Sequence, residues 1–175
     1  TIGIRYAEVI ILTAIALASD IRHYKIRNKL TFTFMLIGLV TGFVLDGTDG
    51  LFDSFLGIAA PFVILILLYA LQMLGAGDIK LFCAIGAVMG FGEGIQIMAY
   101  SFLAGGVIAA IIIIAGKNAK RRFLYMFNYL KCTFLSKSIQ PYTDFEQKDD
   151  KAKFKMAYAI GCGVIIFIAV DILLK

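Results

Sequence analysis

Long apolar runs separated by short polar stretches form the pattern of this chain. A run of about 20 apolar residues is long enough to cross a bilayer as a helix, so 175 residues have room for about six spans. The pattern predicts an all-α, polytopic membrane protein that forms a single domain over residues 1–175. The approximate boundaries of its transmembrane helices are 2–19, 30–45, 55–74, 79–91, 94–116 and 156–174.

Composition supports a membrane protein. Hydrophobic residues make up 61% of the chain and the mean hydropathy is +0.88, whereas a soluble domain is about 45–50% apolar. The net charge of +5 does not indicate nucleic-acid binding in such a chain, and nothing in the sequence indicates an oligomeric state. The sole histidine is His23 and no CxxC motif is present, so we expect no zinc, other metal or cofactor. We expect buried apolar thiols at Cys83, Cys132 and Cys162.

The polar stretches alternate in charge. Residues 20–29 carry four Lys or Arg, residues 46–54 carry three Asp and no base, and residues 117–155 carry ten Lys or Arg. The basic stretches all fall on one side of a six-span path, and the positive-inside rule makes that side cytoplasmic. Both termini are then extracytoplasmic.

The long cytoplasmic loop 117–155 contains its own helical pattern, because apolar residues recur at helical spacing between basic ones. This spacing predicts a cytoplasmic amphipathic helix that either lies on anionic membrane lipids or packs on the bundle. The apolar stripe consists of Phe123, Phe127, Leu130 and Phe134.

The sequence LGAGDIK, residues 74–80, interrupts one of the most apolar regions of the chain. An ionised Asp at the bilayer centre costs roughly 2.5–3.5 kcal/mol on insertion scales. The span that follows, 79–91, is only about 20 Å long as a helix, against a hydrocarbon core of about 30 Å. We therefore expect Asp78 below the membrane surface, in a recess that water reaches.

A second acid, Asp20, ends the first span on the same predicted face. If the first and fourth spans are neighbours, the two carboxylates can share one proton. The ionised acid could then activate water for attack on a peptide carbonyl while the protonated acid donates to the carbonyl oxygen. Gly75 and Gly77, which lack Cβ atoms, would let a substrate strand approach and let the turn adopt a positive φ.

Each of these residues also has a structural interpretation. Asp78 can be an ordinary helix N-cap, and Asp20 can simply end a span at the interface. Lys80 can favour ionisation of Asp78 or extend to lipid phosphate. Asp46, Asp49 and Asp53 are expected in a solvated loop, and Glu8 is expected to pair with Arg5 or to extend outward.

The residues Gly75, Gly77, Asp78 and Lys80 resemble the GxGD signature of membrane aspartic proteases. More narrowly, the chain resembles the type IV prepilin peptidase family and its small Flp-pilus and preflagellin branches. Asp20, in DIRHYKIRN, is similar to the family's first catalytic Asp. The resemblance covers essentially the whole chain, although the Pro that the family often has before its Asn is replaced by Arg27.

The resemblance implies an aspartic endopeptidase in the cytoplasmic membrane of a prokaryote, with Asp20 and Asp78 catalytic and Gly75, Gly77 and Lys80 supporting. Its substrates would be prepilin-like or preflagellin-like precursors, whose leaders it removes at the cytoplasmic face. The paired CxxC motifs of the family's methylating members are absent, which implies no methyltransferase activity. The alternatives are a small proton- or cation-coupled transporter or channel subunit that uses Asp78, and a noncatalytic assembly factor.

Overall fold

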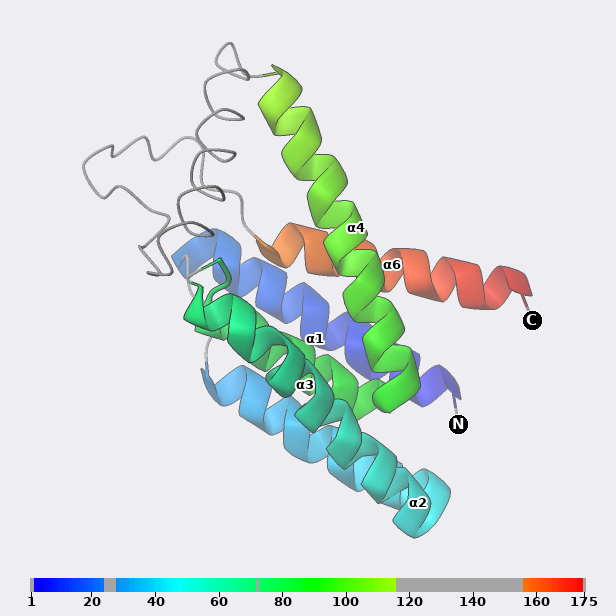
Figure 1. Ribbon diagram of the computed structural model, residues 1–175. Helices are drawn as coiled ribbons and strands as arrows, with labels where there is room; N and C mark the ends of the chain where they lie inside the picture. Colours follow the sequence, from blue (N-terminus) through cyan, green and yellow to red (C-terminus); the bar gives the residue numbers. More distant parts are fainter. Residues whose placement is uncertain (1, 24–27, 72, 116–155, 175) are drawn as a thin grey trace.

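The computed structural model describes residues 2–23, 28–71, 73–115 and 156–174, and helices joined by short turns account for these ranges (Figure 1). The all-helical architecture is as predicted. The expected amphipathic helix of the 117–155 loop lies outside the described residues. The helices are α1 (Ile2–His23), α2 (Asn28–Ala70), α3 (Ala76–Met89), α4 (Phe91–Ala115) and α6 (Met156–Leu174).

Helix α2 turns a sharp corner at Gly47, whose φ of 66° and ψ of −143° favour a residue without a Cβ atom. We call residues 28–46 the first arm and residues 48–70 the second arm. The expectation that 46–54 forms a solvated loop is wrong, because the chain is helical on both sides of this one corner. The two arms correspond to the predicted spans 30–45 and 55–74.

Helix α3 forms the centre of the structure, and every residue from 81 to 90 is buried. Glycines allow the two arms of α2 to approach it closely, as in membrane helix pairs. A Cβ atom on Gly57 would lie 2.0 Å from the carbonyl oxygen of Gly86, and one on Gly38 would lie 2.5 Å from the carbonyl carbon of Ala87. Backbone contact of this kind leaves α3 little freedom to shift along or away from α2.

Helix α1 packs beside this centre and against α6, and α4 crosses α6 where a Cβ atom on Gly163 would lie 2.2 Å from the Ser101 hydroxyl oxygen (Figure 1). The buried positions of α1 follow a single helical stripe that faces the core. Both termini lie at the same end of the molecule (Figure 1). The stripe consists of Val9, Leu12 and Ala16.

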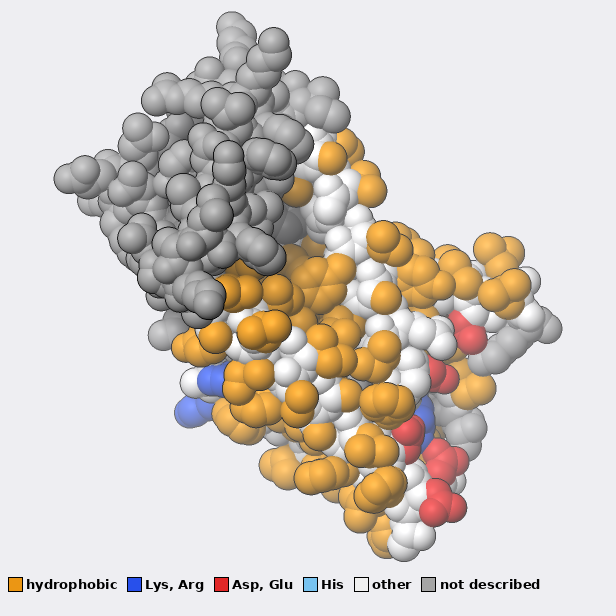
Figure 2. Space-filling view, in the orientation of Figure 1, with side chains coloured by type: hydrophobic (Ala, Val, Ile, Leu, Met, Phe, Trp, Pro, Cys, Tyr) orange, Lys and Arg blue, Asp and Glu red, His pale blue; other side chains and the backbone are white. Residues whose placement is uncertain are grey.

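Four helices, α1, α2, α4 and α6, are long and apolar enough to cross a membrane. Large apolar side chains are exposed along them, and Figure 2 shows apolar atoms over much of the surface of the described helices. Six spans are compatible with this arrangement if the two arms of α2 are counted separately and the short α3 is included. Helix α3 is about 21 Å long, so it cannot reach across a hydrocarbon core of about 30 Å.

Candidate active site

Asp78 lies in the first turn of α3, just outside the predicted span 79–91. The helix begins at Ala76 with Gly75 as its N-cap, so the expectation that Asp78 is the N-cap is wrong by three positions. The backbone N–H of Asp78 donates to the Gly75 carbonyl over 3.1 Å. In return the Asp78 carboxylate accepts a hydrogen bond from the backbone N–H of Gly75, as the third residue of a capping box does.

Asp20 reaches the same end of the molecule on α1. It lies four residues after Ala16, so it continues the buried stripe that faces the core. Helix α1 packs against α3 and runs in the opposite direction, because Arg5 near its start contacts Met89 at the end of α3. The last turn of α1 therefore lies beside the first turn of α3.

The electrostatics of Asp78 reflect this proximity. Burial in a low-dielectric environment is the largest influence, and it raises the pKa of the carboxyl group from 3.8 to about 6 together with the nearby negative charge of Asp20. The hydrogen bond from the Gly75 N–H opposes these effects, because it stabilises the charged form. The two carboxylates are thus within electrostatic reach of one another, and protonation of Asp78 relieves their repulsion.

The two glycines of the motif adopt ordinary backbone conformations. Gly75 has φ −79° and ψ 146°, and Gly77 is inside α3, so the expectation of a positive φ in this turn is wrong. Gly75 has a different steric role. A Cβ atom there would lie 3.1 Å from Oδ2 of Asp78, which is tight enough to displace the carboxylate.

Lys80 extends away from Asp78 and toward the first arm of α2. Its Nζ donates to Oδ1 of Asn28 over 3.0 Å and lies 5.9 Å from the ring centre of Phe32. Lys80 is not among the groups that shift the pKa of Asp78. Asn28 was not identified as a functional residue from the sequence. Its partner Lys80 is 52 residues away in the sequence, and only the position of Asn28 between Asp20 and the second predicted span could have drawn attention to it.

Three acids away from the dyad, Glu8, Asp46 and Asp53, have structural partners. Asp46 pairs with Arg5 over 2.6 Å, so the expected Glu8–Arg5 pair is wrong. Glu8 instead accepts a hydrogen bond from the Thr41 hydroxyl over 2.8 Å. Asp53 accepts one from the backbone N–H of Phe91.

The cysteines and the possible metal ligands are the other reactive side chains of the described residues. Cys83 is buried, as expected. Cys162 was also expected to be buried, but it is exposed. Cys132 lies outside the described residues. Within the part of the chain that the structure describes, no group of three or more His, Cys, Asp or Glu is arranged to hold a metal ion.

Comparison with known proteins identifies the family of the chain. The model of the type IV leader peptidase family matches residues 8–110, a range that contains both Asp20 and Asp78. The prepilin leader peptidase/N-methyltransferase of Bacillus subtilis (strain 168) is 32% identical over 113 residues, which are 63% of this chain and 45% of that protein. The match thus spans less than half of the relative's length. No solved structure matches the chain. The chain belongs to the type IV leader peptidase family.

Proposed function

We propose that this protein is a membrane aspartic endopeptidase that cleaves the leader peptide of prepilin-like or preflagellin-like precursors. The observation that carries the proposal is the effect of the Asp20 charge on Asp78, two acids from distant parts of the chain. Two partly buried negative charges close together destabilise a fold, and acids with shifted pKa values are common at functional sites. The family match covers both residues.

In the proposed mechanism the two carboxyl groups share one proton. Asp78 holds the shared proton, since burial favours its neutral form. The ionised Asp20 removes a proton from a water molecule, which attacks the scissile carbonyl, and Asp78 donates its proton to the carbonyl oxygen as negative charge develops there. A bound substrate would exclude bulk solvent around the dyad while the attacking water stays, and this would favour the protonated form of Asp78 further.

The location of the two acids fits a substrate that consists of a basic leader followed by an apolar helix. The stretches 20–29 and 117–155 are rich in Lys and Arg, and the first of them begins at Asp20, so we propose that the end of the molecule that carries the dyad faces the cytoplasm. The leader would then remain in the cytoplasm, the apolar helix would lie in the bilayer among membrane lipids, and their junction would meet the dyad. Both termini of the chain would be extracytoplasmic.

We further propose cleavage without methyl transfer and without a metal or cofactor. Both acids lie in the range that the family model matches, and the name of the Bacillus subtilis relative includes an N-methyltransferase activity. Mass spectrometry of the processed product checks this point, because methylation of the new N-terminus would add 14 Da. We expect a free amine there, and a methylated amine formed by the purified protein would contradict the proposal.

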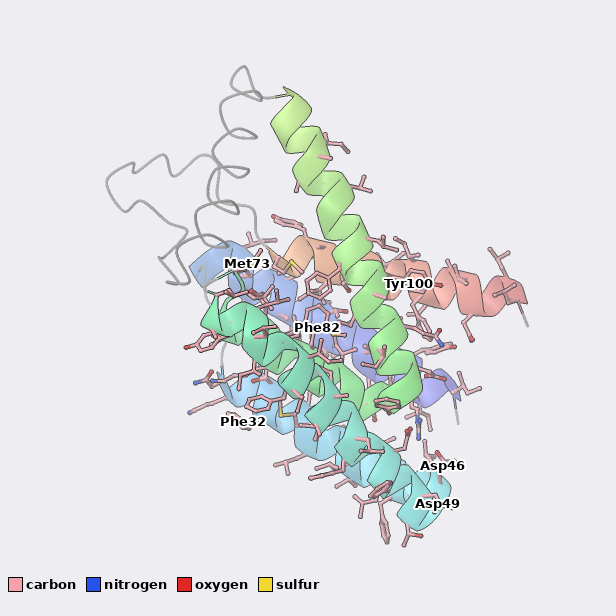
Figure 3. All side chains as sticks on the ribbon, viewed as in Figure 1. Phe32, Asp46, Asp49, Met73, Phe82 and Tyr100 are labelled. Carbon is pink, nitrogen blue, oxygen red and sulfur yellow. The ribbon has the colours of Figure 1, made fainter. Side chains whose placement is uncertain are left out.

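Processing of a precursor by conservative variants tests the dyad. A prepilin-like precursor is co-expressed with the wild type, Asp20→Asn or Asp78→Asn, and loss of the leader is followed by gel shift. We expect both variants to insert and fold but to lose processing. Asp49→Asn is the matched control, because Asp49 is an exposed acid at the corner of α2, at the opposite end of the first arm from Asn28 (Figure 3).

The outcomes separate the candidate functions. Normal processing by either Asn variant would refute the dyad. Normal processing by Asp20→Asn, combined with proton- or cation-dependent transport that only Asp78→Asn abolishes, would favour the transporter alternative. If the folded wild type leaves the precursor intact, the proposed activity itself is wrong.

A further inference from the structure

The side chain of Lys80 links two helices beside the dyad. Its ammonium group donates to the amide oxygen of Asn28 over 3.0 Å, and its charge lies 5.9 Å from the centre of the Phe32 ring. Figure 3 shows Phe32 near the start of α2, at the same end of the molecule as the start of α3. Lys80 is only partly exposed, and the Phe32 ring and the Asn28 amide orient its ammonium group toward α2.

The direction of this link follows from helix geometry. Successive residues in an α-helix are rotated by about 100°, so Lys80 and Asp78 point about 200° apart. Asp78 faces the side from which α1 contributes Asp20, whereas Lys80 faces the first arm of α2. The two residues of the GDIK sequence thus have separate surroundings, although they are only two positions apart.

The link joins the elements that carry the two acids. Asn28 is the first residue of α2, five positions after His23, which ends the helix that carries Asp20. Lys80 lies one half turn after Asp78 in α3. A contact between Asn28 and Lys80 therefore anchors the start of α2 to the start of α3 and limits how far the adjoining end of α1 can move from Asp78.

A direct electrostatic role for Lys80 is the competing explanation. A cation that acts on Asp78 would lower the pKa of that carboxyl group. The influences on Asp78 are burial, the charge of Asp20 and the Gly75 N–H, and Lys80 is not one of them. Among the residues that the structure describes, the hydrogen bond and the cation–π contact of Lys80 both lead to α2.

We propose that Asn28 and Lys80 are a positioning pair, whose hydrogen bond holds the start of α2 against the start of α3 and thereby keeps Asp20 aligned with Asp78. This inference rests on the proposed peptidase function. In this proposal the pair acts on cleavage without contact to the substrate or the reacting water. Its effect on cleavage comes from geometry, since even small misplacement of catalytic groups slows a reaction strongly.

A double-mutant cycle on purified protein in nanodiscs, with a synthetic precursor, tests the pair. We expect Asn28→Ala and Lys80→Met each to lower kcat by roughly tenfold with little change in KM, the size expected for one hydrogen bond to a charged group. The double variant should also lose roughly tenfold and not the hundredfold product, because either change alone breaks the same contact. Lys29→Met is the control, since it removes a neighbouring exposed charge.

Two neutral substitutions of equal length separate positioning from charge. Lys80→Gln retains an N–H donor toward Asn28, whereas Lys80→Met does not, and both remove the positive charge. We expect Lys80→Gln to retain more activity than Lys80→Met, and we expect the midpoint of the pH dependence of kcat/KM to stay unchanged in all of these variants. A charge effect would make the two variants equally slow and would move that midpoint upward in both, but not in Asn28→Ala.

Several results would overturn the inference while the peptidase function stands. These are wild-type rates in Asn28→Ala and Lys80→Met, losses that multiply in the double variant, or equal losses in Lys80→Met and Lys80→Gln. If Asn28→Ala does not fold, the Met and Gln variants of Lys80 still decide between the explanations. A folded wild type that never cleaves the precursor would instead refute the peptidase function.

Discussion

The two ends of α3 differ in their charges. At its first turn Asp78 lies near a second negative charge, that of Asp20, whereas near its last turn a positive charge pairs with a negative one. There Nη2 of Arg5 pairs with Asp46 over 2.6 Å, and Nη1 donates to the carbonyl oxygen of Met89 over 3.3 Å. An arginine at a helix C-terminus satisfies a carbonyl and complements the helix dipole. The charges at the last turn stabilise the fold, and those at the first turn oppose it.

The chain leaves α3 at the same end through a second stabilising contact. Gly90 has a φ of 92°, which favours glycine, and it separates α3 from α4. Asp53 accepts a hydrogen bond from the Phe91 N–H over 3.2 Å and so caps α4. Figure 2 shows acidic side chains gathered at this end with basic atoms among them. Asp46 and Asp53 at this end have structural functions, which makes the like-charge contact at the other end stand out as a candidate for catalysis.

Asp78→Asn should give the largest effect, and it should change cleavage and stability in opposite directions. Cleavage should fall by roughly 10²–10⁴-fold, the range for loss of a general acid or base. Stability should respond in the opposite sense. Because the folded pKa of Asp78 is raised to about 6, the folded state binds more protons, and the free energy of unfolding falls as pH rises from about 4 to about 6.

Thermal unfolding at pH 4.5 and pH 7 checks the sign of this effect. The pH-dependent fall in stability should be smaller in Asp78→Asn than in the wild type, since Asn cannot ionise. An unfolding temperature at pH 7 well below that of the wild type would contradict an unfavourable charge at Asp78.

Arg5→Met should have the next largest effect, and it should act on stability alone. It leaves the Met89 carbonyl without its partner, at a cost of about 1–3 kcal/mol. Asp46→Asn should cost less, because the Asp46 side chain is 51% exposed and exposed ion pairs contribute little. Denaturant titration in detergent measures both variants. A loss of kcat in folded Arg5→Met would show that this end is not purely structural.

Asp53→Ala should destabilise the protein by about 1 kcal/mol, the usual cost of a lost helix cap. Asp53→Asn retains a side-chain oxygen that can accept from the Phe91 N–H, so it should cost less. The same denaturant titration ranks the two variants. Equal stability of wild type and Asp53→Ala would mean that the hydrogen bond to Phe91 contributes nothing.

Gly75→Ala should give the smallest effect, and it should act on cleavage. Its Cβ atom would push Oδ2 of Asp78 by a few tenths of an ångström, so we expect kcat/KM to fall by about two- to tenfold. Gly92→Ala is the control at the opposite end of α3, because a Cβ atom there has nothing within 4 Å. Equal activity of both variants would show that the carboxylate position does not depend on Gly75.

The sequence allowed the helices and the placement of the two acids at one end to be predicted, because both depend on local properties. Apolar runs mark the helices, and the alternation of basic and acidic stretches sets which ends of the spans lie together. Asp20 and Asp78 follow from these two patterns and from the GxGD resemblance. The alignment of the two side chains required the packing of α1 on α3.

The features that sequence reasoning missed depend on long-range partners. Three acids within nine residues suggested a loop at 46–54, yet the chain needs only the corner at Gly47. Asp46 is paired there by Arg5, 41 residues away in the sequence. From the sequence, Lys80 could act on the neighbouring Asp78 or extend to lipid phosphate, whereas its hydrogen-bond partner Asn28 is near only in the fold.

Direct titration of Asp78 tests the central claim that the two acids share one site. Carboxyl ¹³C NMR in lipid nanodiscs, assigned with Asp78→Asn, gives the titration midpoint without any substrate. We expect a midpoint of about 6 in the wild type. In Asp20→Asn it should be lower but still above 3.8, because burial, the larger cause, remains. A wild-type midpoint near 3.8, or one that Asp20→Asn leaves unchanged, would contradict the shared site.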